Sequence, residues 1–229
     1  MDQGDFFTFG VTMAQHLLHS RCIRRSCDIP NLEQVAKPYR SWEDCMRAAA
    51  ECLRGRGDPK YLDMADVLDL ETAVSGGTGD RAGAVAMARE VLKRNPSHAY
   101  AHMIICIHTG VNTGLDVGQN GLKLPGATPF IRRSILKCLT QVYTITALDL
   151  LLRAPPADTH LRRTGAETLT MAREYAEMFI AEAPPDCTDL VDVLDAYILH
   201  TFILRGSELS ENLSELKVRT GFVLLCILN

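Results

Sequence analysis

Apolar residues recur along this chain at the three- and four-residue spacing of helices that bury one face. The clearest example runs from Asp80 to Arg94, where charged residues fill the positions between the apolar ones. Asp80 is a favourable N-cap residue, and Pro96 disfavours helical backbone at Asn95, so both ends of this helix are defined. The predicted apolar face consists of Ala84, Val85, Ala88, Val91 and Leu92.

A second helix is expected after the Asn95-Pro96 turn, from about Ser97 to His108. The residues expected to be buried on it are Ala99, Met103, Ile104, Ile105 and Ile107. Alanines at facing positions allow two helices to approach closely, so the segment 80–110 is a predicted helical hairpin.

The rest of the chain predicts further helices, and prolines at positions 30, 59, 96, 129, 155 and 184 divide it into intervals of about one helical hairpin or one long helix. The expected ranges are 6–20, 41–55, 58–74, 115–122, 128–153, 158–183, 189–206 and 210–216. The helix at 189–206 is apolar nearly all round, so we expect it to be central and packed on several sides. Between the prolines we find no two-residue alternation typical of strands. The pattern predicts an all-α protein, built as an irregular array of helical hairpins.

We divide the chain into an N-terminal helix and loop (1–40), a helical array (41–217) and a short apolar tail (218–229). The tail lacks the charged face of a surface helix. The residues at the boundary, Lys217 to Arg219, are what translation gives when an AAG exon end continues into an intron beginning with GT. We therefore expect 218–229 to be a retained intron or a gene-model error. The alternative is a native helix end that docks on the array.

Composition and charge narrow the class of partner. The chain has 229 residues, 47% of them hydrophobic, and a formal net charge of -4, which argues against nucleic acid or an anionic membrane. The N-terminus has no secretory signal, and the longest apolar run, Phe222 to Leu228, is too short to span a bilayer. We expect an intracellular protein, cytoplasmic or nuclear, whose cysteines are mostly small core residues.

Two groups of residues could in principle bind a metal. His16, His19, Cys22 and Cys27 are all zinc-binding residue types, but their spacing matches no zinc-finger pattern, and the alternative is ordinary helix-end residues. Asp63, Asp66 and Asp69 share one side of a predicted helix, where we expect a solvated acidic face. We therefore assign no metal and no cofactor.

Catalytic motifs are also missing from the sequence. The glycine-rich segment Ser75–Gly79 lacks the Lys-Ser/Thr pair of a phosphate-binding loop, and no Gly-x-Ser-x-Gly occurs. His98 and His102 are four residues apart, but no Glu lies between them as a metalloprotease motif requires. We assign no catalytic residue.

The hairpin at 80–110 carries a resemblance to a known family. Its small residues and its proline resemble the junction between two tetratricopeptide repeats, and the matching residues are Ala84, Ala88, Pro96, Ala99, Ala101 and Ile105. Two residues depart from the pattern: His102 stands where the family often has Trp, and Cys106 where it usually has Gly.

The order of several segments along the chain extends this resemblance. The matching segments are Lys93–Pro96, His98–Ala101, Gly121–Lys123, Thr128–Arg132 and Ala166–Asp186. Together they are similar to the helical, tetratricopeptide-like region of uncharacterised fungal proteins that also carry a MYND-type zinc finger, over about 42–215. In that family the finger follows the helices. This chain has no dense Cys/His cluster, so zinc binding is not carried over.

These observations predict a non-catalytic protein-interaction scaffold, the helical part of a larger zinc-finger protein. Its stacked hairpins present a concave surface to a protein or peptide, and Tyr100 and His102 are the expected partner-binding residues in an exposed groove. The alternative is an all-helical small-ligand binder or enzyme. That alternative predicts an enclosed pocket where acids, histidines or cysteines converge.

Overall fold

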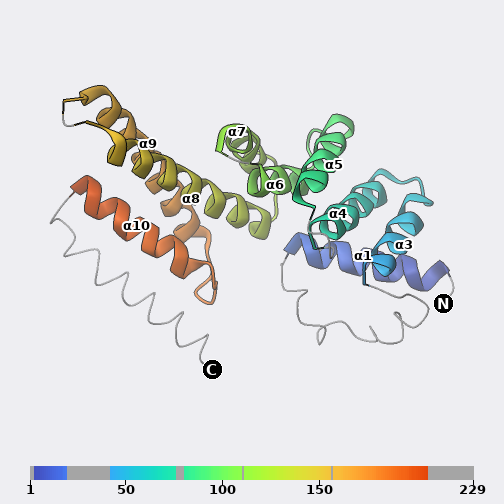
Figure 1. The fold of residues 1–229 in the computed structure, drawn as a ribbon. Helices are drawn as coiled ribbons and strands as arrows, with labels where there is room; N and C mark the ends of the chain where they lie inside the picture. The colour runs from blue at the N-terminus through green and yellow to red at the C-terminus, as the bar shows by residue number, and fades with distance from the viewer. Residues whose placement is uncertain (1–2, 20–41, 76–79, 110, 156, 206–229) are drawn as a thin grey trace. The chain divides into compact units, whose positions relative to one another are not determined.

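The computed structural model describes residues 3–19, 42–75, 80–109, 111–155 and 157–205. Every regular element in these ranges is an α-helix, which confirms the predicted all-α fold (Figure 1). The helices are α1 (Gln3–His19), α3 (Trp42–Arg54), α4 (Pro59–Ser75), α5 (Arg81–Arg94), α6 (Ala99–His108), α7 (Val111–Leu122), α8 (Pro129–Arg153), α9 (Thr159–Glu182) and α10 (Leu190–Arg205). The helix predicted at 210–216 and the tail at 218–229 lie outside the described residues.

The chain divides into two compact units, Met1–Arg132 and Arg133–Asn229. The boundary falls inside α8, whereas the sequence analysis treated 41–217 as one array. The helix that we placed in a separate N-terminal segment, α1, packs on both α3 and α4. Gly10 permits this approach, because a Cβ atom there would lie 3.1 Å from Leu53 and 3.2 Å from Ala49 of α3.

Packing in the first unit follows a regular order. Each helix packs on the next one along the chain, from α3 to α7, and α1 packs on α3. In addition α1 packs on α4, and α4 on α6. Among the described residues no comparably extensive packing joins α3 to α5 or α5 to α7. Since α4 contacts α1, α3, α5 and α6, it is buried nearly all round, including Met64, Ala65, Val67, Leu68 and Leu70.

The predicted helix ends are present where capping residues define them. The Asp80 carboxylate accepts a hydrogen bond of 2.8 Å from the Gly83 amide, and a Cβ atom on Gly83 would lie only 2.2 Å from that carboxylate. The next helix, α6, begins later than the predicted Ser97, because His98 is its N-cap. The Nδ1 atom of His98 accepts from the Ala101 amide at 3.2 Å.

Side chains from all three helices meet in the second unit. The rings of Tyr143 in α8 and Tyr175 in α9 stack with their centroids 5.6 Å apart. Lys137 in α8 donates to Asp189 at 2.6 Å and to Asp192 in α10 at 2.7 Å. These contacts and the packing of α10 on α9 hold the unit together.

The expectation that the helix at 189–206 is packed on several sides is wrong. One side of α10 is buried through Val193 and Leu194, but Leu199, Phe202 and Ile203 are 40%, 61% and 40% exposed. The all-round apolar sequence therefore leaves an exposed apolar face.

By length and composition, α8 is the one described helix that could cross a membrane, and 33% of its most apolar window is buried. Core helices of globular proteins meet the same two criteria. The absence of a membrane partner therefore stays a prediction.

The second unit also contains a buried histidine that makes stability depend on pH. His200 is fully buried, its Nε2 lies 2.6 Å from Thr144 Oγ1, and its Nδ1 has no partner among the described residues. Burial, with the charge of Arg173 as a smaller cause, lowers the pKa of His200 from 6.5 to about 4.

We predict that the second unit loses stability as pH falls from 6.5 towards 4, the window set by the lowered pKa of His200. In that window the unfolded chain binds a proton that the folded chain does not, so acid favours unfolding by about 3 kcal/mol in total. Urea unfolding at several pH values measures this loss. His200→Gln should remove that part of the pH dependence, and an unchanged dependence in the variant would contradict the assignment.

Candidate functional site

The aspartates of α4 face neighbouring helices. Asp66 is 5% exposed, and its two carboxylate oxygens accept from Arg94 Nη2 at 3.1 and 3.2 Å. Arg54 Nη2 lies 3.4 Å from Asp66 and also donates to Asp69. The expectation of a solvated acidic face is therefore wrong. Its physical reason is that α4 lies against α3 and α5, whose last residues are the two arginines.

Electrostatics favour the charged form of Arg54. Desolvation lowers the pKa of Arg54, but the hydrogen bonds and charges of Asp69 and Asp66 outweigh it, so the net pKa is raised. A carboxylate buried between two guanidinium groups satisfies its acceptors with charge-assisted hydrogen bonds. The group thus ties α3, α4 and α5 together at one point.

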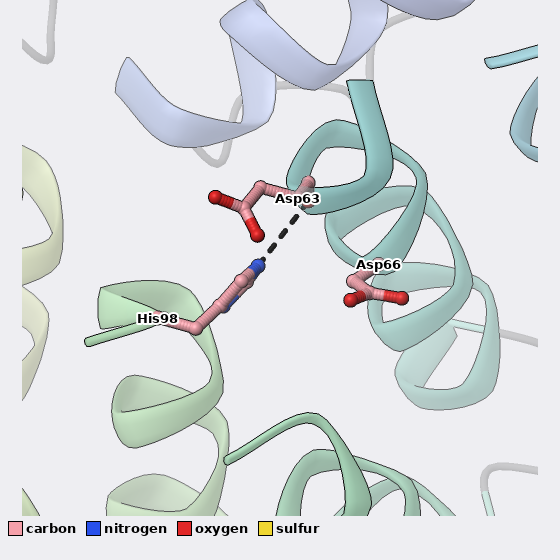
Figure 2. A group of neighbouring side chains, drawn as sticks. All are labelled: Asp63, Asp66 and His98. Carbon is pink, nitrogen blue, oxygen red and sulfur yellow. Dashed lines mark hydrogen bonds between the residues drawn. The ribbon is translucent and has the colours of Figure 1, made fainter. Parts of the chain in front are cut away.

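Asp63 fixes the next turn of the chain. Its Oδ1 accepts from Asn95 Nδ2 at 2.9 Å, and its backbone carbonyl lies 3.2 Å from His98 Nε2 (Figure 2). Because His98 Nδ1 accepts from the Ala101 amide, we infer that Nε2 carries the proton and donates to Asp63. Asp63 therefore holds the turn between α5 and α6 against α4.

We considered whether this cluster could bind a metal ion. One possible ligand atom from each of Asp63, Asp66 and His98 lies within 4.8 Å of the others. The residues do not fit an ion as they stand: two arginines already neutralise Asp66, and both ring nitrogens of His98 are engaged. We assign the cluster a structural role.

The metal candidates predicted from the sequence lie elsewhere. His16 and His19 occupy the last turn of α1, half-buried and exposed respectively. Cys22 and Cys27 are outside the described residues, so that site stays untested.

The two residues predicted to bind a partner are buried. Tyr100 is 1% exposed and its hydroxyl donates to Glu71 at 2.7 Å. His102 is 8% exposed, and its ring nitrogens each lie 2.9 Å from a backbone carbonyl oxygen, those of Val117 and Pro96. The expectation that both side chains are exposed is wrong, because they hold α6 against its neighbours.

A hollow of about 320 Å³ opens beside these contacts. Side chains of α1, α4 and the start of α6, with one glycine, line it: Leu18, Lys60, Asp63, Met64, Val67, Ser97, His98, Ala99, Tyr100 and Gly126. Its apolar wall comes from α1, α4 and α6, while Lys60 and Ser97 are exposed. The volume is at the lower end of the roughly 300–1,000 Å³ typical of ligand sites.

This hollow is better suited to binding an apolar group than to catalysing a reaction. Asp63 and His98 are its charged or titratable polar groups on the inner side, and both already hold the α5–α6 turn. An apolar group could fill the hollow while Lys60 remains available at its edge. Sequence reasoning missed the hollow, since its lining residues are up to 108 positions apart in the chain, from Leu18 to Gly126.

Comparison with protein-family models, with curated proteins and with solved structures gave no match. The account of this site therefore depends on its geometry.

We predict that Asp66→Asn destabilises the first unit by about 2 kcal/mol, because it removes the charge that two arginines share. The exposure of Arg94 keeps the loss below the roughly 3–5 kcal/mol of a fully buried pair. Chemical denaturation measures the change. The matched control is Asp44→Asn, whose carboxylate pairs with Arg47 at the surface at 3.7 Å. Equal stability of the two variants would contradict the structural role of Asp66.

Proposed function

We propose that this chain is a non-catalytic protein-interaction scaffold whose α1–α4–α6 hollow receives an apolar side chain of a partner. The observation that carries the proposal is the hollow itself, with its apolar wall and exposed edge. Buried ion pairs and caps fix its walls before any partner arrives. Preorganisation of this kind reduces the entropy lost on binding.

The size of the hollow limits the binding free energy that it can contribute. Burying one Leu- or Phe-sized side chain contributes roughly 1.5–3 kcal/mol. A complex with micromolar affinity needs about 8 kcal/mol. A partner must therefore also contact the surface around the hollow, where Lys60 and Ser97 are exposed. We expect an extended contact centred on one anchoring side chain.

The packing order gives independent support. It is the order expected of three stacked hairpins, α1/α3, α4/α5 and α6/α7, because α1 packs on α4 and α4 packs on α6. The resemblance to tetratricopeptide repeats leads to the same interpretation. Such arrays present a surface of this kind to peptides or helices.

The alternative function is a small-ligand binder or an enzyme. This alternative requires a pocket where acids, histidines or cysteines converge. The hollow partly meets that requirement, because its wall includes Asp63 and His98. Both residues are already engaged in structural contacts, so we favour the scaffold.

From the resemblance alone, we also propose that the chain is the helical part of an intracellular protein with a MYND-type finger. Sequencing the mature transcript tests this proposal. We expect an open reading frame that replaces 218–229 and continues into a Cys/His-rich segment. A mature transcript whose frame ends at Asn229 would contradict it.

The scaffold role predicts that filling the hollow removes a partner. A Cβ atom at Gly126 meets no atom within 4 Å, so Gly126→Trp should enter the hollow without distorting the backbone. The control is Gly55→Trp, whose Cβ would meet only ordinary contacts of 3.5 Å and which does not line the hollow.

Affinity capture from the cells that express the protein compares the two variants with the unmodified chain. We expect a reproducible partner that Gly126→Trp loses at least fivefold and Gly55→Trp retains. Identical capture by both variants, or no reproducible partner at all, would count against the scaffold.

A further inference from the structure

A second depression lies between α5 and α7, over α6. Its volume is about 290 Å³, and Arg89, Leu92 and Lys93 of α5, Ile105 of α6 and Val117 of α7 line it. Both α5 and α7 pack on α6, and the described residues show no comparably extensive packing between them. The depression is therefore the groove that two helices leave above a third. Its lining does not overlap that of the hollow.

The groove joins an apolar base to a cationic edge. Ile105 is 2% exposed and lies at the base, and Leu92 and Val117 are half-buried. Arg89 and Lys93 are exposed and one helical turn apart on α5. Among the described residues no carboxylate forms an ion pair with Arg89, while Lys93 pairs with Glu90 at 2.6 Å.

The ion pair between Lys93 and Glu90 is too weak to prevent Lys93 from binding another carboxylate. Its two side chains are 71% and 65% exposed. Exposed pairs of this kind are worth about 0–1 kcal/mol, so a partner carboxylate can replace Glu90 at little cost. Both cations are therefore available to an incoming acidic group.

We propose that this groove binds an acidic amphipathic helix of a partner protein. One apolar side chain of that helix rests on Leu92, Ile105 and Val117, and two carboxylates pair with Arg89 and Lys93. This inference rests on the proposed scaffold role but not on the hollow, because it uses a separate surface.

The spacing of the two cations matches acidic residues on a partner helix. Residues four apart on a helix are about 6 Å apart along its axis, and this applies to Arg89 and Lys93. Two Glu residues four apart on a partner helix reproduce that distance and also lie on the same side as an apolar stripe. Recognition of this type is the helix-in-groove mode.

The test uses the full chain and a displayed library of 16-residue helices with a fixed Leu stripe and random polar positions. Selected peptides are then measured by fluorescence anisotropy at low and high salt. We expect the selected peptides to carry an excess of Asp and Glu and to bind more weakly as salt rises. Arg89→Glu should weaken binding about tenfold, because it replaces one attraction by a repulsion.

Three variants serve as controls. Arg81→Glu makes the same charge change on the same helix, outside the groove, and should bind as the unmodified chain does. Arg89→Lys keeps the charge and should bind within threefold. Gly126→Trp fills the hollow and should leave peptide binding unchanged.

Several results would overturn the groove inference: no enrichment, selected peptides without excess acid, full binding by Arg89→Glu, or an equal loss in Arg81→Glu. Loss of peptide binding in Gly126→Trp would overturn it as well, since the peptides would then occupy the hollow. A partner that is captured through the hollow while the library yields nothing would leave the scaffold standing and remove only the groove.

Discussion

The first unit depends on one buried charge, the Asp66 carboxylate held between Arg54 and Arg94. A carboxylate placed in a protein interior without partners costs several kcal/mol, so α4 can occupy its central position only if α3 and α5 bring their cations to it. The same constraint sets where the turn after α5 lies, because Asp63 holds that turn one helical turn away. The hollow and the groove are both consequences of this positioning.

The proposed function follows from what the packing leaves open. The polar groups at the centre of the unit are engaged with one another, which leaves little free chemistry and favours recognition. Residues of α1, α4 and the start of α6 line the hollow, and residues of α5, α6 and α7 line the groove. Two separate surfaces on one compact unit are suited to bringing partners together.

Local signals in the sequence were sufficient for most of the described helices, although α7 begins at Val111 and not at the predicted residue 115. Asp80 and Asp158 cap the helices predicted to follow them, and helix periodicity identified the buried residues Ala84, Val85, Ala88 and Val91 of α5. Contacts between distant residues were not accessible in this way. The arginines that contact Asp66 lie 12 and 28 residues from it in the chain. The local pattern of aspartates on this helix therefore predicted a solvated acidic face. For the same reason Tyr100, which bonds Glu71, was mistaken for a surface residue.

The central claim is that a partner protein contacts the α1–α4–α6 hollow. Site-specific photo-crosslinking in cells tests it most directly, with the crosslinking amino acid at Ser97 on the hollow and, as reference, at the exposed Asp195 of α10. The account predicts a discrete protein adduct from position 97 and none of the same mass from position 195. The same adducts from both positions, or no adduct from position 97, would contradict it.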